Sequence, residues 1–226
     1  MTEGGAQRDG GELPVVAAIR EAIVRGDFVP NQRLVEADLS AQFEASRASV
    51  RSALLELTNE GLVERVQNRG ARVRAVSLEE AVEISEVRMV LEGLCAAKAA
   101  ELATEDDRRE LRKIGARMRD AVATGDVFGY SDLNRRLHAL ILTISGQATA
   151  QTVLGRLRGQ SVRHQFRLAL HPGRPTASLP QHLEIIDAVC DADPDAAEAA
   201  MRKHLRSVVD ALPEVEGSRP RRFDSA

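Results

Sequence analysis

The hydrophobic period of this chain changes near residue 62, and that change restricts the folds open to its first third. Before it, apolar residues recur at helical spacing over residues 14–26, 35–46 and 47–62, and the third segment stops at Gly61. Beyond it, across "LVERVQNRGARVRAV" (residues 62–76), valines are interleaved with charged residues around an Asn-Arg-Gly triplet. This pattern is typical of two short strands joined by a turn. Three helices followed by a hairpin predict a winged helix-turn-helix with a small β-hairpin wing.

From residue 77 onward the sequence keeps a helical period. The stretches "SLEE" and "TEDD" indicate helix starts, because a hydroxyl can cap the first turn and carboxylates favour the positive end of the helix dipole. Glycine and proline residues mark the breaks. The expected helices span residues 78–103, 105–123, 127–145, 149–170, 180–191 and 194–211. The predicted fold class is therefore mainly α, with an all-α antiparallel helical bundle after the winged helix-turn-helix.

These patterns divide the chain into four parts. Residues 13–76 are expected to form the winged helix-turn-helix, and residues 77–213 the helical bundle. Residues 1–12 and 214–226 are rich in glycine or polar residues and cannot build a core, so they are expected to be flexible tails.

Composition excludes several classes of protein. No apolar run approaches the roughly 20 residues that span a bilayer, and the first residues lack the apolar stretch of a secretion signal. We therefore expect a cytoplasmic protein with no membrane partner. The two cysteines, Cys95 and Cys190, lie among apolar neighbours at helical spacing, which predicts buried reduced thiols rather than a disulfide.

A local excess of arginine points to a function for the first block. Residues 46–76 contain six arginines and three glutamates, a net charge of +3, whereas the whole chain carries −3. The third helix buries Val50 and Leu54, which leaves Arg47 and Arg51 together on its exposed face near its N-terminus. A solvated surface is the simplest explanation of such charges. However, arginines at the start of a recognition helix suit bidentate contact with guanine O6 and N7, so the pattern favours DNA binding.

The same block resembles the N-terminal domain of GntR-family bacterial transcription regulators. It carries their R-L-x-E stretch as Arg33–Glu36 and their S-R-x-x-V-R-x-A-L core as Ser46–Leu54. It departs from them at Asn31, where glycine is usual, and at Ala37, where some members have an arginine that touches DNA. The resemblance implies a double-stranded DNA operator as partner, contacted by Arg33, Ser46, Arg47, Ser49, Arg51, Arg69 and Gly70. Because one such domain buries little surface, we also predict a homodimer on a pseudo-palindromic operator.

Three of the five histidines, His138, His182 and His204, lie on the apolar stripes of three different expected helices. A single inward histidine is more often a hydrogen-bonded core residue than a ligand. Three are harder to explain in this way, because each buried imidazole needs its own partner. Facing imidazoles from separate helices are how bundles build metal sites. His164 has no clear assignment, and His171 lies in the "HPGRP" loop, where we expect it to be solvated.

The second block resembles the FCD effector domain of the FadR-like branch of the same family. Its R-x-x-L-E stretch is Arg88–Glu92, and Asn134 stands four residues before His138, where metal-binding members have an aspartate. The neutral amide should weaken metal binding, and Asp132 cannot replace it, because two residues are about 200° around a helix. The resemblance implies a divalent metal ion, Zn or Ni, as cofactor, held by Asn134, His138, His182 and His204.

Arg88 shares an inward stripe with Ile84 and Cys95, and two roles remain open for it. It can form a buried ion pair with a glutamate of a neighbouring helix. Alternatively, its guanidinium can bind the carboxylate of a small-molecule effector beside the metal. Small organic acids and related metabolites are the effectors that the resemblance implies.

Together these features predict a ligand-responsive transcription regulator, a repressor, rather than an enzyme. Two alternatives remain open at this point. One is a helical metalloenzyme with a three-histidine site, although the sequence has no H-E-x-x-H helix and no E-x-x-H pair beside the histidines. The other is the same regulator without bound metal, in which the histidines contact the ligand directly.

Overall fold

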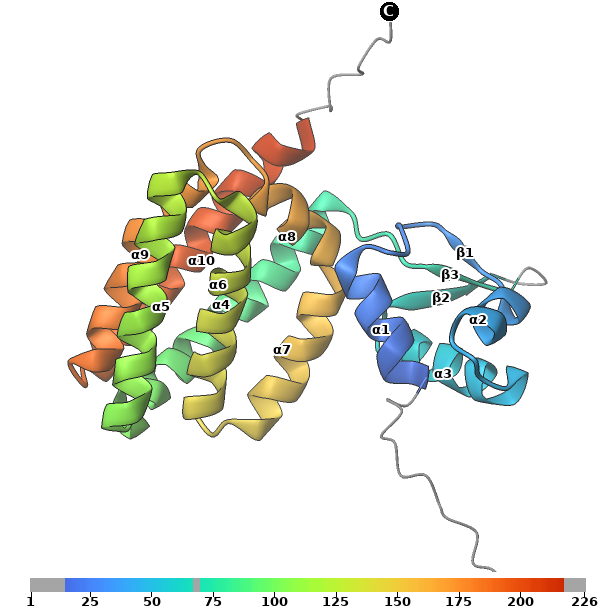
Figure 1. The fold of residues 1–226 in the computed structure, drawn as a ribbon, viewed down its shortest axis with the longest axis horizontal. Coiled ribbons are helices and arrows are strands. Elements are labelled where there is room, and N and C mark those ends of the chain that lie inside the picture. The colour runs from blue at the N-terminus through green and yellow to red at the C-terminus, as the bar shows by residue number, and fades with distance from the viewer. Residues whose placement is uncertain (1–14, 67–69, 218–226) are drawn as a thin grey trace, which may run out of the picture. The chain divides into compact units, whose positions relative to one another are not determined.

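The computed structural model describes residues 15–66 and 70–217, except for the side chains of residues 162, 163, 165, 166, 216 and 217. The chain divides into two compact units between residues 75 and 76 (Figure 1). The predicted fold class is confirmed: a small helical unit with an antiparallel sheet is followed by an all-α unit. Over the described ranges, no helix is both long enough and apolar enough to cross a membrane.

The first unit has helices on a three-stranded antiparallel sheet. Its strand order is β1-β3-β2, so the central strand β3 pairs with the wing strand β2 on one side and with β1 on the other. Ala71 and Val73 alternate inward from β3 and join Ile19, Val50 and Leu57 in one apolar core. The elements are α1 (Val15–Arg25), β1 (Arg33–Leu34), α2 (Glu36–Gln42), α3 (Arg47–Asn59), β2 (Val63–Val66) and β3 (Gly70–Val73).

The second unit is a bundle of helices whose starts follow the capping signals in the sequence. Ser77 accepts a hydrogen bond from the backbone of Glu80, and Thr104 forms a capping box with Asp107. Gly125 ends α5 with a φ of +71°, a left-handed conformation that favours glycine. The helices are α4 (Leu78–Leu102), α5 (Glu105–Thr124), α6 (Val127–Ile144), α7 (Ala148–Gln160), α8 (Val162–Ala169), α9 (Arg174–Cys190) and α10 (Pro194–Gly217).

The core of this bundle determines where its inward polar residues meet. Helix α10 packs along α4 and α9, and both α4 and α9 also contact α6 (Figure 1). Leu137, Ile185 and Met201, one from each of α6, α9 and α10, are almost completely buried in the main apolar cluster. Each fully buried side chain of this size stabilises the fold by roughly 1.5–3 kcal/mol. The inward faces of α6, α9 and α10 are therefore held together by packing.

In the second unit, three helix boundaries differ from the prediction by more than one residue. The expected helix 149–170 is two helices, because Ser161, between α7 and α8, leaves the α-helical conformation with φ −92° and ψ 10°. Helix α9 begins at Arg174 rather than at residue 180. Gly173 takes a left-handed conformation just before it, and Pro175 lies in the first turn, where its missing N–H is not needed.

The C-terminal boundary was also wrong. Helix α10 continues to Gly217 through Pro213, so residues 214–217, expected to begin a flexible tail, are helical. Val215 is buried, and its packing explains the extension. The two-residue strand β1 was not predicted, because it is too short to show an alternating pattern. The rest of the expected tails lies outside the described residues.

Candidate functional site

The first candidate site is the exposed start of α3. Ser46 is its N-cap: its Oγ accepts a hydrogen bond from the Ser49 N–H at 3.1 Å, and the two hydroxyl groups are 2.8 Å apart. This cap sets where the helix begins. Arg47 and Arg51 are consequently exposed within its first two turns, as the helical pattern predicted.

Arg51 is held by a carboxylate from α2. Its Nε donates to Glu36 Oε1 at 3.1 Å and its Nη2 donates to Oε2 at 2.9 Å, so two parallel bonds join the groups. The hydrogen bond from Arg51, together with the positive charges of Arg51, Arg47 and Arg65, lowers the pKa of the Glu36 carboxyl. The sequence analysis recognised Glu36 only as the last residue of the R-L-x-E stretch and assigned it no role.

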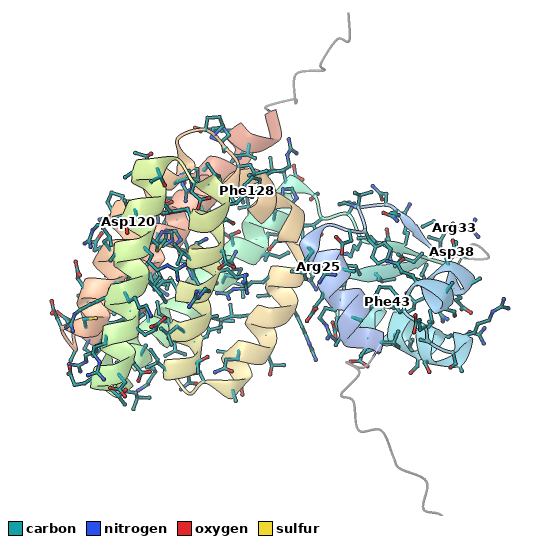
Figure 2. All side chains as sticks on the ribbon, in the orientation of Figure 1. Arg25, Arg33, Asp38, Phe43, Asp120 and Phe128 are labelled. Atoms are coloured by element: carbon teal, nitrogen blue, oxygen red, sulfur yellow. The ribbon has the colours of Figure 1, made fainter. Side chains whose placement is uncertain are left out.

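A groove of about 420 Å³ lies between α3, β1 and the wing. Arg33 and Arg65 line it together with Glu36, Arg51 and Gly70. Arg33 is exposed on the edge strand β1 (Figure 2). Gly70 has a φ of +86°, a left-handed conformation suited to the start of the returning strand. Three predicted DNA contacts therefore line one groove: Arg33 of β1, Arg51 of α3 and Gly70 of β3. Arg69, another of them, lies outside the described residues.

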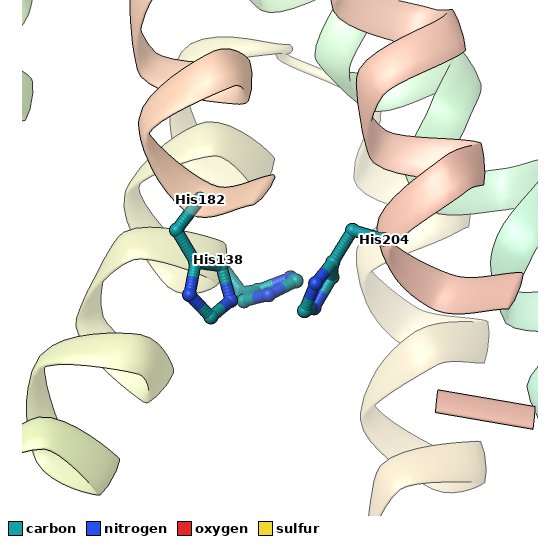
Figure 3. A group of neighbouring side chains, drawn as sticks. All are labelled: His138, His182 and His204. Atoms are coloured by element: carbon teal, nitrogen blue, oxygen red, sulfur yellow. The ribbon is translucent and has the colours of Figure 1, made fainter. Parts of the chain in front are cut away.

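The second candidate site is a group of three buried imidazoles. His138 of α6, His182 of α9 and His204 of α10 face one another (Figure 3). One ring nitrogen of each lies within 4.8 Å of the other two. All three side chains are buried, with exposures of 5%, 1% and 3%. The structure therefore brings together the three histidines that the sequence analysis selected.

Hydrogen bonding fixes the protons of two of these rings. His138 Nδ1 lies 2.7 Å from Glu92 Oε2, and His204 Nδ1 lies 3.0 Å from Gln181 Oε1. Both oxygens can only accept, so each Nδ1 carries the proton and donates it. Each Nε2 is left with a lone pair when the ring is neutral.

The third ring reaches the same tautomer through Tyr130. The Tyr130 hydroxyl is 2.9 Å from Ser178 Oγ and 2.8 Å from His182 Nδ1. Ser178 donates its own proton to the carbonyl of Arg174 at 2.8 Å, so Tyr130 must donate to Ser178. Tyr130 then accepts from His182 Nδ1–H. His182 Nε2 is left as a buried lone pair with no hydrogen-bond partner in the described residues.

The electrostatics keep these imidazoles neutral. Burial lowers the pKa of all three, and the neighbouring histidines lower those of His182 and His204 further. Asn134 lies one turn before His138, and its Oδ1 is also buried without a partner in the part of the chain that the structure describes. Among the described residues, His182 Nε2 and Asn134 Oδ1 are thus buried acceptors without a donor, and such groups are expensive to leave unpaired. A divalent cation is the group that fits them.

Beside the histidines, α4 contributes a buried charge network centred on Glu92. This carboxylate is completely buried and bonds to Arg88 Nε at 2.9 Å, Arg158 Nη2 at 2.9 Å and His138 Nδ1 at 2.7 Å. Burial alone would raise the pKa of Glu92, but the charges of Arg88 and Arg158 hold it well below its usual range. The ion pair considered for Arg88 is therefore present, and its partner is on the same helix rather than on a neighbouring one.

The two remaining histidines lie outside the cluster. His164 is buried in α8, where its Nε2 lies 2.9 Å from the Val76 carbonyl oxygen, so it links α8 to the start of this unit. His171 is half-buried, between α8 and α9. Cys95 and Cys190 are buried free thiols, as predicted.

Comparison with known proteins agrees with both units. Residues 13–73 match the family of bacterial regulatory proteins called gntR, and residues 83–207 match the FCD domain. The chain is 27% identical over 197 residues to the HTH-type transcriptional repressor RspR of Escherichia coli, covering 87% of this chain and 86% of that protein. It is 30% identical over 215 residues to an HTH-type transcriptional regulator in an unstable DNA locus of Streptomyces ambofaciens, covering 91% and 86%.

This chain belongs to the GntR family, in the branch that carries an FCD domain. The solved structure of McbR/YncC from E. coli has the same fold, with a TM-score of 0.79 at 21% identity over 91% of this chain and 98% of that one. The GntR regulator is therefore a DNA-binding transcription regulator and not an enzyme. The metalloenzyme alternative was wrong.

In this GntR regulator, sequence reasoning missed the residues that orient the histidines. Glu92 follows Arg88 by four residues, so a pair on one helix face was visible in the sequence. Gln181 precedes His182 directly, and Tyr130 is the only tyrosine of the chain, but nothing in their spacing indicates their partners. Arg174 was assigned to a loop. It starts α9 and donates to the carbonyl and the hydroxyl of Ser207.

Proposed function

We propose that this regulator is a repressor that binds a pseudo-palindromic operator as a homodimer and senses a small organic acid beside a divalent metal ion. One observation carries the metal and effector part: one nitrogen of each of the three buried imidazoles lies within 4.8 Å of the other two, and His182 Nε2 has no hydrogen-bond partner among the described residues. Two relatives, RspR of Escherichia coli and NanR of Cronobacter sakazakii, are named as transcriptional repressors, which supports repression as the direction of regulation.

The proposed metal ligands are His138, His182 and His204 with the amide oxygen of Asn134. Three atoms no more than 4.8 Å apart lie within about 2.8 Å of a common centre, against roughly 2.1 Å for a bond between zinc and nitrogen. Movements of less than about 1 Å would therefore close the site. A bound ion would supply an electrophilic centre with open positions for an effector oxygen. Zn or Ni suits imidazole nitrogens, and Asn134 leaves the site less negative than an aspartate would.

The proposed effector is a small carboxylate. Arg88 is the residue that we assign to it, because its Nε is used by Glu92 while the terminal nitrogens of its guanidinium remain as further donors. Arg174 adds a second positive charge near Tyr130 and the histidines. A surplus of positive charge around neutral imidazoles favours an anionic ligand.

The proposed DNA contacts are those of the first unit. Arg47 and Arg51 would read bases from the start of α3, and Ser46 and Ser49 would present the capped helix N-terminus to a phosphate. Arg33, Gly70 and Arg69 would follow the backbone or the adjacent groove from β1 and the wing. The cytoplasm is the expected place for this activity.

The proposed homodimer uses α4. Val87, Val90 and Leu94 are 49%, 50% and 41% exposed and are spaced three and four residues apart, so they form one apolar stripe on the face opposite Arg88 and Glu92. A second copy of the same stripe is a matching partner, and a palindromic operator requires two copies.

Metal analysis of the purified protein tests the proposal against its metal-free alternative. We expect about one divalent ion per chain in the wild type and in His171→Ala, whose histidine lies outside the cluster, and none in His182→Ala. Chelation should lower the melting temperature of the first two proteins and leave that of His182→Ala unchanged. A metal-free wild type that still releases or binds its operator in response to a carboxylate would support direct contact between histidines and ligand instead.

A further inference from the structure

Glu36 places a negative charge on the proposed DNA-binding face. It is the first residue of α2 and lines the groove between α3, β1 and the wing. The positive charges of Arg47, Arg51 and Arg65 act on its carboxylate. DNA presents a dense array of phosphates to this face, and affinity depends mainly on neutralising them. A carboxylate here opposes that attraction, so its presence needs a reason other than affinity.

The geometry of its bonds to Arg51 supplies one. The two bonds use Nε and Nη2, which form the side edge of the guanidinium. The end edge, formed by Nη1 and the second proton of Nη2, makes no hydrogen bond within the described ranges. That edge has the spacing for a bidentate contact with O6 and N7 of guanine. Glu36 therefore fixes the plane of the group without occupying the donors that would read a base.

Glu36 and Arg51 belong to different helices, α2 and α3. The pair joins α2 to α3 across 15 residues of sequence, and 64% of the arginine side chain is exposed. Without this anchor, a long exposed arginine samples many rotamers, which must be restricted when it binds. A free arginine would also reach any nearby phosphate and lower discrimination between sequences.

We propose that Glu36 is a positioning residue for sequence discrimination: it holds Arg51 ready for an end-on contact with guanine and repels DNA that offers no such contact. This inference rests on the proposed role of Arg51 as a base contact. It predicts that Glu36 lowers affinity for arbitrary DNA while it maintains affinity for the operator.

The wing provides a matched control. Arg72 Nε donates to Glu64 Oε1 at 2.6 Å, and this pair lies on neighbouring positions of β3 and β2. Both glutamates are 37% exposed and paired with an arginine of the same unit. Removing either charge changes the net charge equally, but only Glu36 bonds to an arginine of the recognition helix.

The test measures dissociation constants of the full-length protein at one salt concentration. The probes are a duplex selected by the wild type from a random-sequence pool and an unselected duplex of the same length. Glu36→Gln should bind the unselected duplex severalfold more tightly, with unchanged or weaker binding to the selected one, so that their ratio falls about tenfold. Glu64→Gln should strengthen both alike and keep the ratio. Glu36→Asp retains the charge but is too short for both bonds, and it should also lower the ratio.

The double variant separates the possible failures. In an Arg51→Ala background, which itself should lower the ratio, Glu36→Gln should change it no further. If Arg51→Ala leaves the wild-type ratio intact, the proposed base contact of Arg51 is wrong. If Arg51→Ala lowers the ratio but Glu36→Gln behaves like Glu64→Gln, Glu36 contributes only charge and the present inference is overturned. Thermal melting of each variant verifies that these exposed substitutions leave the fold intact.

Discussion

Individual protons decide what the histidine cluster can bind. On His138 and His204, acceptor oxygens from Glu92 and Gln181 keep the proton on Nδ1, and on His182 the chain through Tyr130 does the same. The same neighbours orient the rings, as groups hydrogen-bonded to the histidine ligands of a metal usually do. The residues around the imidazoles therefore matter as much as the imidazoles themselves.

Replacing Asn134 by aspartate should strengthen metal binding. The Asn134 amide oxygen is buried without a partner, and a carboxylate in its place would add a charged ligand. We expect affinity to rise on the order of tenfold, which corresponds to about 1.4 kcal/mol. Competition with a chromophoric chelator measures this directly. Asp132→Asn, on an exposed position of the same helix, is the control and should leave affinity unchanged. Equal affinities for Asn134→Asp and wild type would remove Asn134 from the ligand set.

Acid should destabilise the metal-free protein below about pH 6.5. Burial lowers the pKa of His138, His182 and His204 in the folded chain, whereas unfolded imidazoles titrate near 6.5. Below that pH the unfolded chain binds protons that the folded chain does not, so the free energy of unfolding falls as pH falls. Melting temperatures of chelator-treated protein between pH 7.5 and 5.5 measure this slope. It should be shallower in His204→Gln than in the wild type; identical slopes in the two proteins would contradict the account.

At the scale of elements, capping residues predicted correctly where helices begin, whereas proline residues did not mark helix ends. Ser77 and Thr104 begin α4 and α5 where their hydroxyl groups predicted. Pro180 and Pro213 lie inside helices, although proline usually ends them. Buried residues on both sides of each proline, such as Ser178 and Val215, show that tertiary packing overrides the local penalty. No pattern confined to a few residues contains that information.

The N-cap of the recognition helix gives a prediction at this scale. Ser46→Ala removes the oxygen that accepts the Ser49 N–H, and such a loss typically costs about 1 kcal/mol. Urea denaturation should show this decrease in the free energy of unfolding. Ser52→Ala is the control, because Ser52 is an exposed interior position of α3 where alanine is a better helix former. If the two variants unfold alike, the cap does not stabilise α3.

Across the whole chain, the sequence predicted which residues matter better than it predicted their partners. The three histidines were recognisable because each lies on an apolar stripe of its own helix. The pairing of Glu92 with His138 spans 46 residues and depends on how α4 meets α6, which helical period does not encode. The same holds for Glu36 and Arg51 in the first unit. Local patterns identify faces of helices, and packing determines which faces meet.

Effector binding can regulate DNA binding only through a difference in free energy between two arrangements of the protein. In a homodimer, those arrangements differ in how the two DNA-binding units are presented to the operator half-sites. We therefore expect the proposed dimer contact to lie in the second unit, where the effector is proposed to bind. Helix α4 meets this requirement, because it carries Arg88 and Glu92 on one face and the exposed stripe of Val87, Val90 and Leu94 on the other.

Replacing Val90 by glutamate should consequently separate the dimer. A carboxylate in the middle of the stripe would lie opposite its own copy, where like charges repel and desolvation is unfavourable. Phe128→Glu is the control: Phe128, labelled in Figure 2, is 70% exposed and lies on α6 rather than on α4. Sedimentation equilibrium at micromolar concentration should show a monomer for Val90→Glu and a dimer for wild type and Phe128→Glu.

Affinity for a two-half-site operator should fall on the order of 100-fold for Val90→Glu, because the second half-site is no longer bound intramolecularly. Metal content should stay at the wild-type level, since the substituted side chain points away from the histidines. A dimeric Val90→Glu protein with full operator affinity would place the contact elsewhere on the chain.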